Sequence, residues 1–360
     1  MVKPMDLSKF RKTISKNIEG LSIGFNDPKT WISTGSYALN YLISGDFNNG
    51  IALGKVSILA GESGSGKSLI SANIVRNAQE KGVFVILVDT ENALDETWLQ
   101  AFGVDTSPEK LLKLSMAMVN DVAKSISEFV KEYKSIPTDD RPEVLFVIDS
   151  LGMLLVDAQT DQFERGELKG DFGHKPKALK ALITNCVNMF GGLGIGLLAT
   201  NHTYQSQNIF SPDDVVSGGS GPIFAASMLV AMKKGKLKED EDGNKVTEVA
   251  GIRSMCKVMK TRYNKPFEGT ELKIPYSGGL DKYSGLFEMF EDNGLFSKDG
   301  HKSVYVAHDG TVLKLFRKGW NRNEDGCMDI VMGDIMKTPG GLFKTVAPTT
   351  PTDTSDENDN

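Results

Sequence analysis

The stretch Gly61-Glu62-Ser63-Gly64-Ser65-Gly66-Lys67-Ser68 decides the fold of this chain, because it fits the phosphate-loop pattern G-x-x-x-x-G-K-[ST] without a mismatch. It follows the apolar run 56–60 and precedes a helical stretch, which is the context that the motif requires. In such a loop, backbone N–H groups surround the phosphates and the helix N-terminus adds partial positive charge. We therefore expect a nucleoside triphosphate, with Lys67 at its β- and γ-phosphates and the Ser68 hydroxyl on Mg²⁺. The alternative is a Gly/Ser surface turn with an incidental lysine.

Three more apolar runs end in polar residues, and each is typical of a strand buried on both faces of a parallel sheet. The runs are residues 83–88, 144–148 and 195–199, which lead into Glu91, Asp149 and His202. Helical candidates alternate with the strands, at residues 68–81, 119–133 and 177–190. The pattern predicts an α/β fold with a mostly parallel central sheet. Ligands of such sheets bind beyond the carboxyl ends of the strands, where Lys67 and these three polar residues should converge.

Each of the three polar residues has a functional interpretation and a plainer alternative. Asp149 fits a Walker-B carboxylate that faces Mg²⁺, but an acid after a strand is often a helix cap or loop residue. Glu91 is a candidate general base for the attacking water, or else a solvated loop glutamate. His202 can donate a hydrogen bond to the γ-phosphate and report its loss, or it is an ordinary polar residue.

Further stretches make the chain resemble the RecA family of strand-exchange recombinases. They are Ile32-Ser33-Thr34-Gly35-Ser36, Asp89-Thr90-Glu91-Asn92-Ala93-Leu94-Asp95, Gly103-Val104-Asp105, Gly218-Gly219 with Phe224, and Lys260-Thr261-Arg262 followed by Pro266-Phe267. They occur in the family's order over residues 30–290. The stretches 200–204 and 218–222 are similar to the UvsX recombinases of large tailed phages. Bacterial RecA has glutamine where this chain has His202, which favours the phage branch.

The resemblance implies a RecA-like P-loop NTPase core that binds ATP and Mg²⁺. It implies that Glu91 is the catalytic carboxylate and that His202 senses the γ-phosphate. Trp98 stands where RecA has a tyrosine that stacks on adenine, and an indole can do the same. Asp95 and Tyr276 also match positions at the edge of the nucleotide.

Lys260 and Arg262 match a pair of cations that reaches the γ-phosphate of the neighbouring protomer in the family. A cation inserted there stabilises transition-state charge and is worth about 10³ or more in rate. Hydrolysis would then depend on assembly. The alternative is that both are exposed basic residues on a late strand.

Two segments, residues 157–176 and 203–222, are long, polar and without a sustained apolar period, which favours mobile functional loops over compact structure. The resemblance implies that they are the DNA-binding loops. Glycine amides can approach phosphates closely, and an apolar side chain can wedge between bases. The residues assigned to DNA are Lys175, Lys177, Ile209, Phe210, Gly218, Gly219, Ser220 and Gly221. The alternative is a pair of disordered surface insertions.

The composition does not by itself indicate nucleic-acid binding. The chain carries 41 basic and 47 acidic residues, a net charge of −6, so no global positive field steers DNA toward it. Affinity would have to come from local sites repeated along an assembled filament. The composition of the acidic end, residues 351–360, predicts a disordered tail. Such a tail could compete with DNA or recruit a basic partner.

The expected organisation is one main domain with appendages. Residues 1–30 contain a basic amphipathic helix that the resemblance places on the adjacent protomer, and residues 31–290 form the core. A charged run at 233–248 predicts an exposed hairpin. A small extension at 291–340 and a disordered acidic tail at 341–360 follow, too short for the larger C-terminal domain of bacterial RecA.

The cysteines and the chain start favour the cytoplasm, which is the host's if a phage encodes the protein. Cys186, Cys256 and Cys327 are widely spaced, as suits a reducing compartment rather than a disulfide framework. Residues 1–15 are too polar for a signal peptide, and no apolar run approaches the length of a membrane span.

These observations predict an ATP-dependent recombination protein that forms a helical filament on single-stranded DNA and exchanges strands with a duplex. Single-strand-binding and mediator proteins are further candidate partners. One alternative is a hexameric helicase or other motor with the same core. Another is a non-catalytic ATP-gated scaffold, against which the joint presence of Lys67, Glu91 and Asp149 argues.

Overall fold

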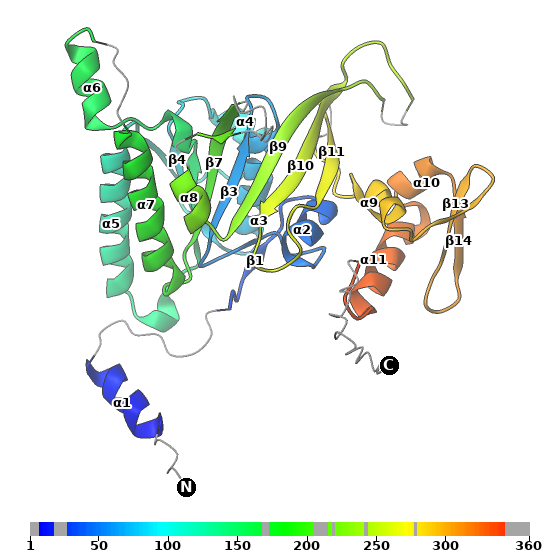
Figure 1. Cartoon of the computed structure of the whole chain (residues 1–360), viewed down its shortest axis with the longest axis horizontal. Coiled ribbons are helices and arrows are strands. Elements are labelled where there is room, and N and C mark those ends of the chain that lie inside the picture. Colours follow the sequence, from blue (N-terminus) through cyan, green and yellow to red (C-terminus); the bar gives the residue numbers. More distant parts are fainter. Residues whose placement is uncertain are drawn as a thin grey trace, which may run out of the picture. The chain divides into compact units, whose positions relative to one another are not determined.

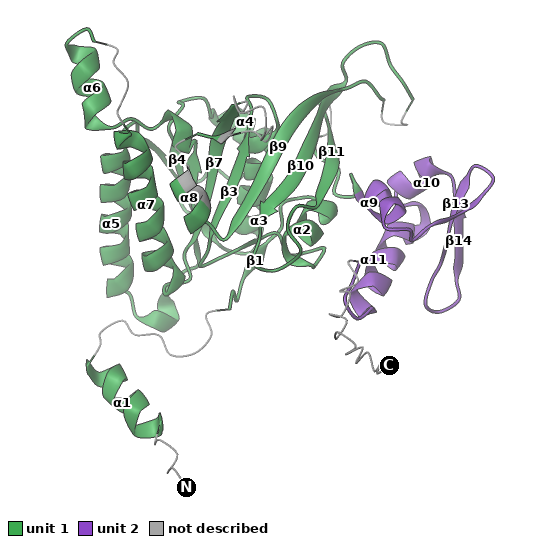
Figure 2. Ribbon diagram, viewed as in Figure 1, with its two compact units in different colours: residues 1–285 green, residues 286–360 purple. Residues whose placement is uncertain are grey.

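The computed structural model describes residues 7–17, 27–167, 173–204, 215–217, 220–240, 244–276 and 279–342. The chain divides into two compact units, Met1–Gly285 and Leu286–Asn360 (Figure 2). No helix in the described part is long and apolar enough to cross a membrane.

The larger unit is organised around a sheet with the order β11-β10-β9-β3-β7-β6-β4-β5, and β8 pairs with β7 (Figure 1). The strands are β3 (Val56–Gly61), β4 (Phe84–Asp89), β5 (Leu111–Ser115), β6 (Val144–Asp149), β7 (Gly196–Tyr204), β8 (Val215–Val216), β9 (Met228–Leu237), β10 (Gly251–Lys260) and β11 (Gly269–Pro275). Pairing is parallel from β9 through β5 and antiparallel in β9-β10-β11 and in β7-β8. The four strands expected from the sequence are β3, β4, β6 and β7, so the parallel α/β core is confirmed.

Helices cover the parallel strands. The helices of this unit are α1 (Leu7–Asn17), α2 (Tyr37–Ser44), α3 (Lys67–Glu80), α4 (Glu96–Ala101), α5 (Val119–Ser135), α6 (Asp157–Glu164), α7 (His174–Gly191) and α8 (Ser220–Ala225), and β1 (Trp31–Ile32) pairs with β2 (Ile51–Ala52). Helices α5 and α7 lie side by side and share one apolar cluster with the sheet (Figure 1). Phe146 of β6 stacks on Phe190 of α7 with ring centroids 5.3 Å apart. In β4, Ile86 and Val88 belong to this cluster, and Val85 and Leu87, which point to the opposite face of the sheet, are also buried. Burial on both faces is expected for a strand that is covered on both sides.

The expectation of an irregular loop over residues 157–176 is wrong at both ends, because α6 occupies Asp157–Glu164 and α7 begins at His174. Polar contacts start α6: the Val156 N–H donates to Gln159 Oε1 (3.2 Å), and the Asn120 amide donates to Asp157 Oδ2 (2.8 Å). No side chain of α6 is buried, so hydrophobic periodicity gave no sign of it. In the second segment, β7 continues to Tyr204 and α8 begins at Ser220, while residues 205–214 and 218–219 lie outside the described residues.

Two smaller expectations hold. Helix α1 forms where the basic amphipathic stretch predicted it, and it has no buried residue. Strands β9 and β10 pair in antiparallel, with a bridge between Glu239 and Lys245 beyond their ends, as a hairpin requires.

The smaller unit holds its own core. Its elements are α9 (Leu286–Asp292), β12 (Ser297–Asp299), β13 (Lys302–Val306), β14 (Val312–Leu315), α10 (Arg317–Asn321) and α11 (Cys327–Lys337), with the sheet order β12-β13-β14. Trp320 is fully buried, lies 4.6 Å from the Phe296 ring and donates its indole N–H to the Ser303 carbonyl. The unit starts at Leu286 rather than at residue 291, because Phe287 and Phe290 of α9 belong to this aromatic core.

Candidate functional site

The phosphate loop connects β3 to α3 and depends on its glycines. Gly64 and Gly66 have φ of 75° and 96°, in the left-handed region that other residues avoid. A Cβ at Gly61 would collide with the Met232 carbonyl oxygen of the neighbouring strand β9. Gly66 caps α3 without a side chain, so the first N–H groups of the helix face the loop. The loop and the helix N-terminus therefore form a site for an anion.

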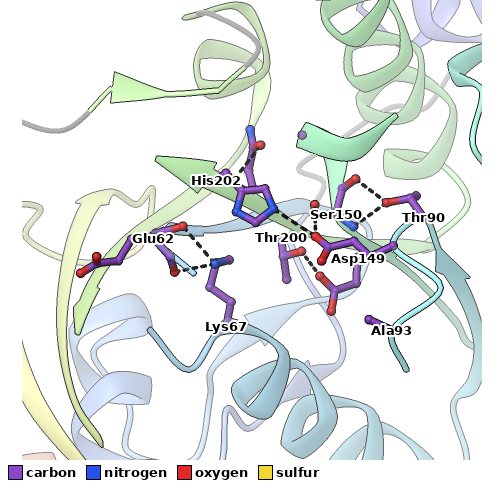
Figure 3. A network of polar contacts seen from close by, with 12 residues as sticks. Glu62, Lys67, Thr90, Ala93, Asp149, Ser150, Thr200 and His202 are labelled. Atoms are coloured by element: carbon purple, nitrogen blue, oxygen red, sulfur yellow. Dashed lines mark hydrogen bonds and ion pairs between the residues drawn. The ribbon is translucent and has the colours of Figure 1, made fainter. Parts of the chain in front are cut away.

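Lys67 lies inside this loop, with only 7% of its surface exposed (Figure 3). Its Nζ donates to the carbonyl oxygens of Gly61 and Glu62, both at 2.9 Å. Burial lowers the pKa of Lys67, and the negative charges of Asp149 and Glu91 oppose that shift. Nearby, the buried Ser65 hydroxyl has no hydrogen-bond partner within the described part of the chain. A charged ammonium and an unsatisfied hydroxyl are groups that phosphate oxygens would satisfy.

Asp149 ends β6 and is buried close to the phosphate loop (Figure 3). Burial raises the pKa of its carboxyl, and hydrogen bonds from the Thr200 and Ser68 hydroxyls work against this shift. Ser68 and Asp149, the pair expected to hold Mg²⁺, are thus in contact. No cluster of three or more His, Cys, Asp or Glu able to hold a metal occurs in the described ranges. The pair suits a Mg²⁺ ion that takes its remaining ligands from phosphates and water.

Glu91 and His202 meet, as the convergence of strand ends predicted. Oε1 of Glu91 lies 3.0 Å from His202 Nε2 and accepts a hydrogen bond from the Ser150 hydroxyl at 2.7 Å. The histidine is the donor when the carboxylate is ionised, because a carboxylate can only accept. His202 pairs with Gly61 in the β3-β7 register, so it lies beside the phosphate loop. The catalytic candidate and the sensor candidate therefore share one hydrogen-bonded cluster.

The sequence reasoning missed Asp89, which shapes the turn that carries Glu91. Its carboxylate is 1% exposed and accepts the backbone N–H groups of Glu91, Ala93 and Leu94 at 3.2, 3.4 and 3.2 Å. Lys113 of β5 forms an ion pair with it at 3.0 Å. Asp89 stands opposite Asp149 in the β4-β6 register, and its position at a strand end was the signal that could have revealed it.

A cleft of about 720 Å³ brings Trp98 and Tyr276 together with Leu69 and Arg76 of α3. This is the surface where the resemblance places the base, and the Trp98 ring packs against Phe102 in a tilted arrangement, with ring centroids 4.7 Å apart. Asp95 has another role here: its carboxylate caps α4 by accepting the Trp98 N–H at 2.7 Å.

Lys260 and Arg262 are not brought to the phosphate loop of their own chain. In the sheet register, Lys260 pairs with Leu229, and Leu229 pairs with Ile58 near the start of β3, whereas the loop follows its end at Gly61. Lys260 Nζ donates to the Phe224 carbonyl at 2.7 Å. Burial and then the charge of Arg262 lower the pKa of Lys260.

The residues assigned to DNA are described only in part. Lys175 donates to the Gly152 carbonyl at 2.5 Å, which ties the start of α7 to the turn after β6, and Lys177 is exposed. Gly221 approaches α7 so closely that a Cβ would lie 2.8 Å from Lys180 Cβ, so its small size serves helix packing. Ser220 opens α8, and Ile209, Phe210, Gly218 and Gly219 lie outside the described residues.

Comparisons with known proteins relate the chain to one family. Residues 20–281 match the family model of the RecA N-terminal domain. The recombination and repair protein of Enterobacteria phage T4 is 27% identical over 310 residues, which cover 84% of this chain and 75% of that protein. Protein RecA of Streptomyces rimosus is 28% identical over 296 residues, covering 80% and 70%. Protein RecA of Rhodococcus jostii is 26% identical over 306 residues, covering 83% and 81%.

The cleft around Trp98 generates a first prediction. Replacing Trp98 by Ala should weaken ATP binding about tenfold, since stacking of a base on an aromatic ring contributes ~1–3 kcal/mol. Replacing it by Phe should keep the affinity within about threefold, because a π-face remains. Isothermal titration calorimetry on folded variants measures both. Parental affinity in the Ala variant would show that the base does not stack on Trp98.

Proposed function

The chain belongs to the RecA N-terminal domain family, and from this membership we propose that it binds ATP with Mg²⁺, polymerises on single-stranded DNA and exchanges strands with a homologous duplex. It is a recombination and repair protein with DNA-dependent ATPase activity. The observation that supports the proposal best is the meeting of Lys67, Asp149, Glu91 and His202 at the carboxyl ends of four adjacent parallel strands.

Three residues of this group, together with Ser68, have a task in hydrolysis. Lys67 exchanges the loop carbonyls of Gly61 and Glu62 for phosphate oxygens, which are stronger acceptors for an ammonium group. Ser68 and Asp149 would hold Mg²⁺, which would supply positive charge to neutralise the phosphates. Glu91 accepts the proton of the attacking water at its carboxylate, and the turn built on Asp89 holds it in place.

A second prediction tests the catalytic carboxylate. Replacing Glu91 by Gln should preserve ATP binding, because the phosphate contacts remain, and should slow hydrolysis on single-stranded DNA by about 10²–10⁴-fold through loss of the base. Electron microscopy should show continuous helical filaments that persist with ATP. The exposed Glu132 of α5, replaced by Gln, is the matched control and should behave as the parent.

Two results would contradict this assignment. Hydrolysis at the parental rate by the Glu91→Gln variant on saturating DNA would remove Glu91 from catalysis. Closed rings in place of filaments would favour a hexameric motor that uses the same core.

Lys260 and Arg262 are proposed to complete the site of a neighbouring protomer. Their place near the start of β3, away from the loop of their own chain, supports action in trans. The partly buried Lys260 is held by the Phe224 carbonyl, at the end of α8, so that contact would have to be exchanged for the neighbour's phosphate. Loss of that contact would free the Phe224 carbonyl, and the state of the nucleotide would in this way affect the segment before β9.

A third prediction separates assembly from nucleotide binding. Alanine at both Lys260 and Arg262 should leave ATP affinity of the dispersed protomer nearly unchanged and abolish DNA-stimulated turnover. Mixing this variant with a Lys67→Ala variant should recover part of the turnover, because one protomer supplies the cations and the other the phosphate loop. Mixed filaments, verified by two fluorescent labels, that show no recovery would argue against action in trans.

The remaining parts of the proposal concern location and partners. We place the protein in the cytoplasm, the host's if a phage encodes it, where single-strand-binding and mediator proteins would act with it. The cysteines are buried, and burial raises the pKa of the Cys186 and Cys256 thiols to about 12, so these thiols are unreactive packing residues.

A further inference from the structure

We propose that Ser150 is the positioning residue of the catalytic carboxylate: its hydroxyl is the fixed donor that holds Glu91, whereas His202 is the exchangeable donor. The inference rests on the proposed role of Glu91 and adds a residue to it. Its basis is that two donors from different strand ends converge on a single oxygen, Oε1 of Glu91.

The backbone of Ser150 is held rigidly by Thr90, the residue that precedes Glu91. The Ser150 N–H donates to Thr90 Oγ1 and the Thr90 hydroxyl donates to the Ser150 carbonyl, both at 2.8 Å (Figure 3). The Thr90 N–H also donates to the Asp149 carbonyl at 2.8 Å. Ser150 has no exposed surface. These three bonds tie the ends of β4 and β6 together, so the Ser150 hydroxyl starts from a fixed point beside Glu91.

The hydrogen bond from Ser150 limits the rotation of a side chain that is otherwise free to move. Glu91 is about one-third exposed, and an unrestrained glutamate samples many rotamers, so fixing it costs conformational entropy. Both recorded donors bind Oε1, so Oε2 is the oxygen left to accept a proton from water. A hydroxyl that donates to an ionised carboxylate makes a short, strong bond, in agreement with the 2.7 Å distance.

The two donors differ in their freedom to leave. The His202 side chain is 33% exposed and stands at the end of β7, next to the phosphate loop. One N–H makes one strong hydrogen bond, so His202 must leave Glu91 if its Nε2 binds the γ-phosphate. Ser150 is buried and tied to Thr90, and it has no such competitor. Of the two side chains that donate to Glu91 within the described residues, Ser150 is the one that still holds it when His202 contacts the nucleotide.

The test compares steady-state ATP hydrolysis on saturating single-stranded DNA. Ser150→Ala should lower kcat about 10–100-fold with KM within about threefold of the parent, because the phosphate contacts are intact. Ser150→Cys, which keeps a weaker donor, should fall between Ala and Ser. Ser71→Ala is the matched control. Ser71, on α3, is buried like Ser150, but its hydroxyl has no hydrogen-bond partner in the described residues. It should hydrolyse ATP at the parental rate.

A double-mutant comparison distinguishes positioning from a general structural role. In a Glu91→Gln background there is no base to position, so adding Ser150→Ala should change the residual single-turnover rate less than twofold. A further 10-fold loss in that background would show that Ser150 acts on something other than Glu91. A parental kcat in Ser150→Ala, or equal rates for the Ala and Cys variants, would also overturn the proposal. If instead Glu91→Gln itself hydrolyses ATP normally, the role of Glu91 fails.

Discussion

The parallel pairing of β3, β4, β6 and β7 is the constraint on which the rest of the structure depends. Parallel strands end at the same edge of a sheet, so the phosphate loop, Asp89, Asp149 and His202 are brought together from four distant parts of the chain. Helices pack on these strands and their side chains are buried on both faces, so the polar groups gather at the edge where the strands end. The site is therefore a consequence of the topology.

At this edge, buried charges are balanced in a way that a nucleotide would change. The Lys67 ammonium group donates to loop carbonyls, and burial lowers its pKa. Burial also raises the pKa of the Asp149 carboxyl. The proposed triphosphate with Mg²⁺ would supply acceptors to the lysine and a cation to the aspartate. His202 is placed to respond, since its contact with Glu91 and a contact with the γ-phosphate exclude each other. Because β7 continues from His202 to Tyr204, a change there begins at the start of the second proposed DNA segment.

Long buried strands and the phosphate loop could be predicted from the sequence, because their apolar runs and glycines encode them locally. The site residues that depend on register and side-chain geometry could not. Asp89 looked like any acid after a strand until its three backbone hydrogen bonds were located, and Ser150 acquires its role only through Thr90. Helix α6 was not predicted, because polar contacts define its start and its sequence has no buried apolar face. The cap that Asp95 forms on α4 also depends on side-chain geometry, and its place at the edge of the nucleotide stays a prediction.

The proposed coupling of the bound nucleotide to DNA passes through His202, so the affinity of a His202→Ala variant for single-stranded DNA tests it. Binding is measured with an ATP analogue and with ADP, at matched ionic strength because phosphate contacts are salt-sensitive. We expect the variant to bind ATP within about tenfold of the parent (~1.4 kcal/mol) and to bind DNA with an affinity that no longer depends on the nucleotide. His301→Ala, at an exposed position, is the control and should behave as the parent. A His202→Ala variant that still binds DNA much more tightly with the ATP analogue than with ADP would contradict it.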